Sequence, residues 1–142
     1  MTQAEKISLD ILDATGEKFP AEILLWEGDP QHEDQVKLIL RFADRQLEQT
    51  DNNFFHALVA IRQELERDNL LLNCYGASKT VYPSPMALNM GTGEMAYKLT
   101  IGKKARQEDL VSIFDVGSDV VPATVNQQKN FYDDWLKSLS KA

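Results

Sequence analysis

The stretch of residues 70–102 constrains the fold more than any other part of this sequence. An apolar run at residues 70–75 and an alternating pattern at residues 95–101 each predict a strand. The segment between them is rich in Gly, Ser and Pro, yet it keeps apolar side chains at Val81, Tyr82, Met86, Leu88 and Met90. Loops of this length inside a compact domain are uncommon and are usually functional or disordered. Because disordered segments lack apolar side chains, we expect residues 76–94 to form a packed structure that a sheet displays.

Two further strand patterns precede this stretch. Ile7, Leu9 and Ile11 alternate with polar residues, which predicts a strand with one buried face. A turn is predicted at residues 13–17, and the run at residues 23–26 is apolar on both faces, as in a more central strand. We therefore predict that these two strands form a hairpin.

A pair of helices is predicted to follow the hairpin. Asp29 can cap a helix that begins at Pro30. Apolar residues then recur at helical spacing, namely Val36, Ile39, Leu40, Ala43 and Leu47. A second helix is predicted at residues 54–68, with His56 on its solvated face. The short connection between the two helices favours an antiparallel pair.

The beginning of the first predicted helix is crowded with ionisable side chains, namely Glu27, Asp29, His32, Glu33 and Asp34. One interpretation of this crowding is a metal site. Carboxylates also complement the positive end of a helix, and the spacing does not match a calcium-binding loop. We therefore favour the electrostatic interpretation and expect no bound metal.

A strand at residues 110–114 and a final helix complete the predicted order. Thr124 and Gln127 fit a capping box at the start of this helix, whose aromatic stripe is expected to pack on the sheet. The elements then run strand, strand, helix, helix, strand, strand, strand, helix. Such runs of like elements predict one α+β domain over residues 1–142, with a mixed or mainly antiparallel sheet of about five strands and three helices.

Composition limits the classes of partner. The 142-residue chain has a net charge of −7 and an isoelectric point near 4.8, which disfavours nucleic acid and anionic membranes as partners. An acidic surface suits solubility or a basic protein partner.

We expect Cys74, the one cysteine, to be a buried hydrophobic residue. No signal peptide or membrane span is predicted, so we expect a cytoplasmic protein.

One motif suggests a nucleotide site. Residues 91–96 fit G-x-G-x-x-[GA], and Asp115 follows at about the distance at which an acidic residue meets a ribose. The motif needs a strand before it and a helix after it. Pro83 and Pro85 precede it instead, and residues 97–102 alternate like a strand. A small-molecule or nucleotide-binding enzyme that uses Gly91, Gly93 and Asp115 is therefore the alternative hypothesis, not the leading one.

No group of residues in the sequence forms a catalytic constellation. Hydroxyl groups need a base to become nucleophiles, and the two histidines and one cysteine do not provide one in a matching pattern. We expect neither a cofactor nor a metal, and we favour binding over catalysis. Tyr and Met give contact area and Ser and Gly give adaptable hydrogen bonds. The candidate binding residues are Tyr75, Ser78, Lys79, Tyr82, Ser84, Met86, Gly91, Gly93 and Tyr97.

The same residues carry a resemblance to a known family. The signatures CYGA, YPSPM, MGTG and AYKL, within residues 74–99, resemble those of small acidic bacterial proteins of uncharacterised activity. The likeness spans about residues 7–139 and implies a bacterial, intracellular, single-domain protein without assigned catalytic residues. Proteins of this kind are often immunity or accessory proteins for secreted toxins. Our leading hypothesis is a non-catalytic cytoplasmic binding protein that binds a basic partner through residues 76–94 and the acidic entry to the first predicted helix, and the neutralisation of a toxin is one role that it could have. Two open alternatives are a loop that only covers its own sheet and a homo-oligomer whose loops pair.

Overall fold

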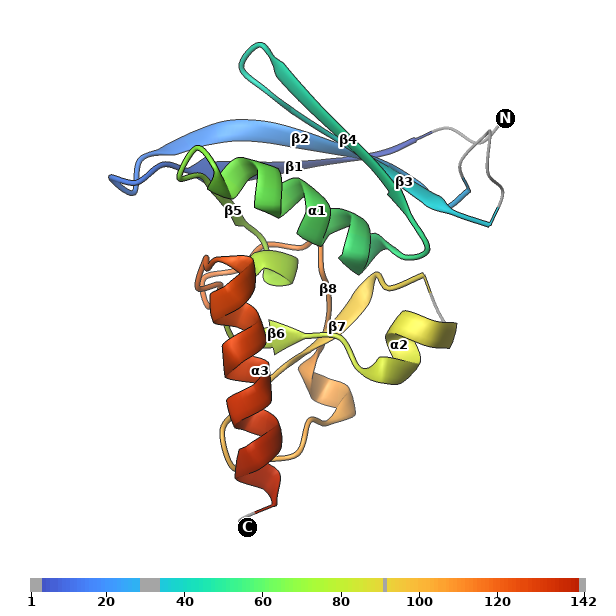
Figure 1. Cartoon of the computed structure of the whole chain (residues 1–142), viewed down its shortest axis with the longest axis vertical. Helices are drawn as coiled ribbons and strands as arrows, with labels where there is room; N and C mark the ends of the chain where they lie inside the picture. Colours follow the sequence, from blue (N-terminus) through green and yellow to red (C-terminus); the bar gives the residue numbers. More distant parts are fainter. Residues whose placement is uncertain (1–3, 29–33, 91, 141–142) are drawn as a thin grey trace.

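A five-stranded antiparallel sheet forms the upper layer of the protein in Figure 1, with α1 (Phe54–Glu66) packed beneath it. The computed structural model describes residues 4–28, 34–90 and 92–140. The strand order is β4-β3-β2-β1-β5. The strands are β1 (Glu5–Leu12), β2 (Lys18–Trp26), β3 (Val36–Phe42), β4 (Arg45–Asp51) and β5 (Leu71–Asn73). Apolar side chains at alternate positions on these strands point towards α1 and form the core.

The predicted hairpin of β1 and β2 is confirmed. Its register runs from Glu5 opposite Leu25 to Leu12 opposite Lys18. The turn between the strands is held by Asp13, whose Oδ1 accepts hydrogen bonds from the backbone N–H groups of Thr15 (2.9 Å) and Glu17 (3.0 Å). An Asp side chain that bonds to the following backbone in this way stabilises a turn.

The helix predicted over residues 36–47 is wrong, because β3 and β4 form a second hairpin there. Ala43, with a φ of 50°, lies between the two strands, and Leu47 pairs with Leu40. Both faces of β3 carry apolar residues, since Ile39 is buried on the face opposite to Leu40. Apolar residues on both faces of a central strand hide its period of two and mimic helical spacing. The predicted cap at Asp29 and Pro30 lies outside the described residues.

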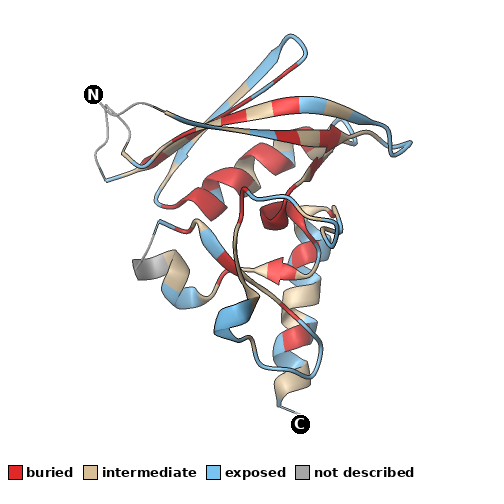
Figure 2. Cartoon of the chain, turned by 180° about the vertical axis from the view of Figure 1, so that it is seen from behind, coloured by how far each residue is buried: buried red, intermediate tan, exposed pale blue. Residues whose placement is uncertain are grey.

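The second predicted helix is confirmed as α1. Asn53 caps it, because its Oδ1 accepts a hydrogen bond from the backbone N–H of His56 at 2.8 Å. The His56 side chain is 51% exposed, as predicted. The predicted apolar face of α1 is fully buried at Phe54, Leu58, Ile61 and Leu65. Figure 2 shows this buried face in red between the sheet and the lower half of the protein.

The region after β5 forms a second, smaller antiparallel sheet, whereas the sequence predicts a single sheet of about five strands. Its strand order is β6-β7-β8. The elements are η1 (Tyr75–Ala77), β6 (Val81–Tyr82), α2 (Pro85–Met90), β7 (Met95–Lys98), η2 (Gln107–Asp109), β8 (Leu110–Ser112) and α3 (Val125–Leu139). In Figure 1 this sheet and α3 lie below α1. The described residues thus form a single α+β domain of two sheets and three α-helices, in agreement with the predicted class.

A buried polar hub joins the two halves. Arg62 of α1 is only 2% exposed and donates hydrogen bonds to the carbonyl oxygens of Gly76 (3.1 Å) and Ala123 (3.0 Å). It also donates to Gln128 Oε1 of α3 at 2.6 Å. The Gln128 amide then donates to the carbonyl oxygens of Gly76, Ser78 and Val81. Every buried polar group of the hub is paired, so α1, α3 and the segment after β5 are fixed against one another.

The predicted capping box of α3 is confirmed: Thr124 Oγ1 accepts from the Gln127 backbone N–H, and Gln127 Oε1 accepts from that of Thr124. The helix itself packs on α1 and on β6, a strand of the small sheet. The Tyr132 ring stacks on Tyr82, with ring centres 4.1 Å apart. In the described part of the chain, no helix combines the length and the apolar character that a membrane span needs.

Cys74 is fully buried and unpaired, as predicted. Burial raises the pKa of its thiol to about 11, against the opposing effect of the nearby Arg62 charge. The thiol is therefore protonated at neutral pH, and it packs as a small hydrophobic side chain.

Candidate functional site

The segment of residues 76–94 is folded into η1, β6 and α2, and part of the predicted binding set holds it in place. The Tyr75 hydroxyl donates a hydrogen bond to Asp119 Oδ1 at 2.6 Å. Ser78 is fully buried, and its Oγ accepts a hydrogen bond from the backbone N–H of Val121 at 2.9 Å. Both side chains thus bind the segment to the loop before α3, which is a structural role.

Other members of the predicted set are also engaged within the protein. Ser84 Oγ accepts a hydrogen bond from the Ala87 backbone N–H at 3.1 Å, at the beginning of α2. Tyr82 lies between the rings of Phe55 (5.1 Å between centres) and Tyr132, and Tyr97 pairs with it across the small sheet. Burial raises the pKa of the Tyr82 hydroxyl. The Tyr82 ring is therefore engaged by aromatic neighbours from both α1 and α3.

Two residues of the predicted set remain free for a partner. Met86 is 70% exposed on α2. Lys79 is exposed, with its Nζ 6.0 Å from the centre of the Phe131 ring. Gly91 lies outside the described residues. Most of the predicted binding residues therefore form contacts within the protein, and Met86 and Lys79 are the exposed ones.

Gly93 of the nucleotide-like motif packs against the cap of α1. It has a φ of 77°, and a Cβ at this position would lie 2.8 Å from the Cβ of Asn53. The neighbouring Thr92 carbonyl accepts a hydrogen bond from the Phe54 backbone N–H at 2.7 Å. The motif is preceded by α2 and followed by β7, whereas a dinucleotide site needs the opposite order. The need for glycine at position 93 thus has a structural explanation.

The nucleotide hypothesis remains a prediction that a thermal-shift screen decides. A nucleotide at a hundred times its dissociation constant should stabilise the protein by about 2.7 kcal/mol. We expect no shift with nucleoside mono-, di- or triphosphates, with or without Mg²⁺. A reproducible upward shift that is lost in Asp115→Asn would instead support the nucleotide-binding alternative.

Three carboxylates from other parts of the chain lie within electrostatic reach of Glu94, near the end of this segment, a grouping that the sequence pattern does not indicate. We call Glu5, Glu27, Glu94 and Asp115 the carboxylate cluster. Burial raises the pKa of Glu94, and the charges of Glu5, Glu27 and Asp115 raise it further. Within the described ranges, none of the four side chains forms an ion pair or a hydrogen bond. The neighbouring negative charges and partial burial disfavour the ionised form of Glu94, so its charge is a cost to the isolated protein.

Glu94→Gln is expected to stabilise the protein at neutral pH. A carboxyl group with a raised pKa binds its proton more tightly in the folded state, so stability falls as pH rises from about 4.5 through the raised value. Because Glu94 is only half-buried, we expect a gain of at most about 1 kcal/mol at pH 7. The gain should vanish at about pH 3 and shrink in high salt.

Urea unfolding across this pH range measures the effect, with Glu17→Gln as the control. Glu17 is an exposed residue of the first hairpin turn, so its neutral variant should stay within about 0.5 kcal/mol of wild type. A Glu94→Gln protein that is less stable than wild type at pH 7 would show that burial and the neighbouring charges do not disfavour the Glu94 carboxylate.

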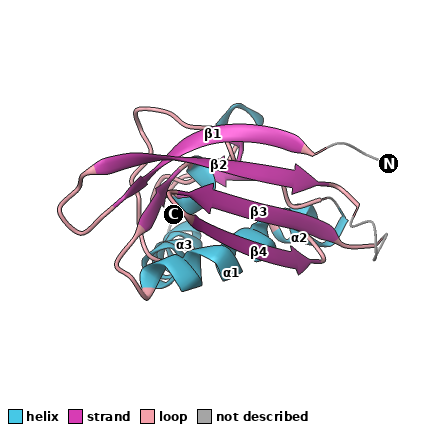
Figure 3. Cartoon of the chain, turned by 90° about the horizontal axis from the view of Figure 1, so that it is seen from above, coloured by secondary structure: helices cyan, strands magenta, loops and turns pink. Residues whose placement is uncertain are grey.

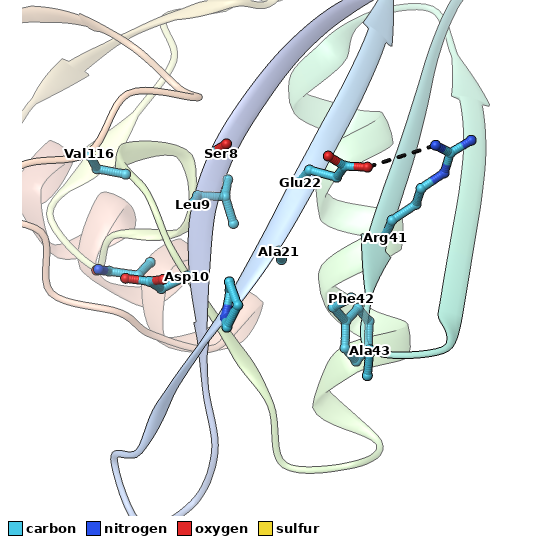
Figure 4. Close-up of a pocket in the computed structure, with 11 residues that line it drawn as sticks. Ser8, Leu9, Asp10, Ala21, Glu22, Arg41, Phe42, Ala43 and Val116 are labelled. Carbon is cyan, nitrogen blue, oxygen red and sulfur yellow. Dashed lines mark ion pairs between the residues drawn. The ribbon is translucent and has the colours of Figure 1, made fainter.

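An open hollow of about 630 Å³ lies on the face of the large sheet that is turned away from α1, the face that Figure 3 views. Figure 4 shows its wall at Glu22 and Arg41, whose charged atoms are 3.8 Å apart. The floor carries Ser8, Asp10 and Asn73, whose side chains form no hydrogen bond to any described residue. The hollow therefore offers unpaired acceptors and donors to solvent.

The remaining chemistry of the described chain is sparse. No set of three or more His, Cys, Asp or Glu side chains in residues 4–28, 34–90 and 92–140 has the geometry to hold a metal ion. A second hollow of about 750 Å³ lies around Lys103, Lys104 and Arg106, where Glu108 and Asp109 offset the positive charge.

Comparison with models of protein families finds no match for this chain, and comparison with curated proteins finds no similar sequence.

Proposed function

We propose that this protein is a non-catalytic cytoplasmic binding protein that neutralises a basic protein partner, as bacterial immunity and accessory proteins do for secreted toxins. The observation that supports the proposal is the carboxylate cluster. Its members come from four separate segments of the chain, and the charges of Glu5, Glu27 and Asp115 act on Glu94 without a described cation paired to any of the four. A fold that tolerates such repulsion gains free energy when a cationic surface covers it.

The surroundings of the cluster suit a protein partner. Glu94 ends the segment of residues 76–94, so exposed side chains of that segment, including Met86, are available at the border of an interface. Exposed Met side chains adapt to varied apolar surfaces. Charge would then steer the basic partner, and apolar contact would hold it.

A capture experiment with three baits tests the proposal. The wild-type protein is compared with a cluster variant, E5Q/E27Q/E94Q/D115N, and with a control variant, E17Q/D44N/E108Q/D134N, which neutralises exposed carboxylates elsewhere. Both variants change the net charge equally. We expect extracts of the native host to yield a basic protein in equimolar amount with the wild-type and control baits, and little of it with the cluster variant.

Three results of this experiment would contradict the proposal. Equal capture by all three baits would mean that binding does not use the cluster. An equimolar partner that is acidic, or the lack of any equimolar partner under low salt, would also overturn it. Circular dichroism of the variants separates lost binding from lost structure.

A further inference from the structure

Strand β1 is only partly covered on one of its two edges. All eight of its residues pair with β2. On the other side, β5 pairs only with Asp10, Ile11 and Leu12. No other described group forms a hydrogen bond with the backbone of residues 5–9. This half of β1 therefore presents a row of unpaired N–H and C=O groups, which is the template for an added strand.

We propose that residues 5–9 of β1 receive an extended basic segment of the partner, which pairs with this edge as a sixth strand of the large sheet. The inference rests on the proposed function and names the partner segment and its mode of binding. Peptides that extend a sheet take their affinity from backbone hydrogen bonds and their specificity from alternate side chains.

The charge distribution favours a basic occupant. Glu5 lies on β1 itself, on the same face as Leu9 and Ile11, because alternate residues of a strand share a face. Glu5 on this face belongs to the carboxylate cluster, since its charge, together with those of Glu27 and Asp115, acts on Glu94. Every second side chain of an added strand would point to that face. Lys or Arg at alternate positions would therefore meet the carboxylate cluster.

The intervening side chains of the added strand would point to the opposite face of the sheet. There the hollow in Figure 4 borders the uncovered half of β1 and is lined by Ser8, Asp10, Asn73 and Val116. The unpaired groups of Ser8, Asp10 and Asn73 suit side chains that donate and accept hydrogen bonds, such as Thr or Gln. Both faces of the edge thus have complementary surroundings for a strand that alternates basic and polar residues.

The edge also lacks most of the usual protection against strand pairing. Natural edge strands are often protected by proline, a bulge or outward lysines. Residues 5–9 contain no proline, and the single lysine, Lys6, is paired with Glu22 at 3.1 Å. A free strand edge kept in this form is expected where another strand binds.

The test uses an octapeptide of alternating Lys and Thr with blocked ends, added to ¹⁵N-labelled protein in low salt. We expect half-saturation below about 1 mM and amide shifts centred on residues 5–9. Two N-methylated peptides keep the charge but remove alternate N–H donors. The peptide methylated at the N–H groups that would face β1 should bind at least about tenfold more weakly than the parent peptide. The peptide methylated at the N–H groups that would point away from β1 should bind within about twofold of the parent.

Each outcome decides between the two proposals. If both methylated peptides bind as the parent does and the cluster variant loses binding, charge recognition stands and strand addition is overturned. If the cluster variant binds the parent peptide as the wild type does, the proposed function fails as well. Shifts centred on β4, or no binding at about 1 mM, would overturn strand addition at β1.

Discussion

Replacing Arg62 with Met is expected to lower the free energy of unfolding by about 3–5 kcal/mol, the largest effect that we predict for a single substitution. The variant keeps the volume of the side chain but removes every donor. The Ala123 carbonyl and Gln128 Oε1 would lose their buried hydrogen-bond partner. Each buried acceptor without a partner costs about 1–3 kcal/mol, and the contact between α1 and α3 would loosen as well.

Urea unfolding at neutral pH measures this effect, with Arg67→Met as the matched control. Arg67 lies on the exposed end of the same helix, so its loss should change stability by less than about 0.5 kcal/mol. Arg62→Lys should fall between the two, because it keeps the charge but not the planar set of donors. An Arg62→Met protein within about 1 kcal/mol of wild type would show that the hub does not hold the two halves together.

Gly93→Ala is expected to lower the free energy of unfolding by about 2–4 kcal/mol. Two costs combine at this position. Alanine disfavours the left-handed φ of 77°, and its Cβ would lie 2.9 Å from Asn53 Oδ1, the atom that caps α1. The cap would have to move, and the bond between Phe54 and Thr92 would be strained with it.

The control for Gly93→Ala is Gly102→Ala. Gly102 has a φ of 82°, but a Cβ there would meet nothing within 4 Å. This variant should therefore lose only about 1–2 kcal/mol, the cost of the left-handed backbone alone. Thermal unfolding of both proteins separates backbone strain from packing. Equal losses would contradict the structural explanation for glycine at position 93.

The sequence correctly predicts the elements that depend only on residues close together in the chain. The β1–β2 hairpin, α1 and the capping box of α3 each depend on periodicity or on a cap within a few residues. The β3–β4 hairpin was missed for a physical reason. A strand at the centre of a sheet buries apolar residues on both faces, so its spacing does not distinguish it from a helix.

The features that define the candidate site could not be predicted in this way. The carboxylate cluster combines residues 5, 27, 94 and 115, and only the tertiary fold brings the other three charges within reach of Glu94. Arg62 and Gln128 are also far from each other in the sequence. In the sequence alone, each resembles a polar residue on the exposed face of a helix. The predicted binding residues Tyr75 and Ser78 have internal partners for the same reason: their contacts come from residues 119 and 121.

The dissociation constant of the purified complex with the captured partner tests the central proposal most directly. Isothermal titration of that partner into the wild type, the cluster variant and the control variant should give values for the wild type and the control within about threefold of each other. The cluster variant should bind at least about a hundredfold more weakly, a loss of about 2.7 kcal/mol. Equal dissociation constants for all three proteins would contradict recognition through the carboxylate cluster.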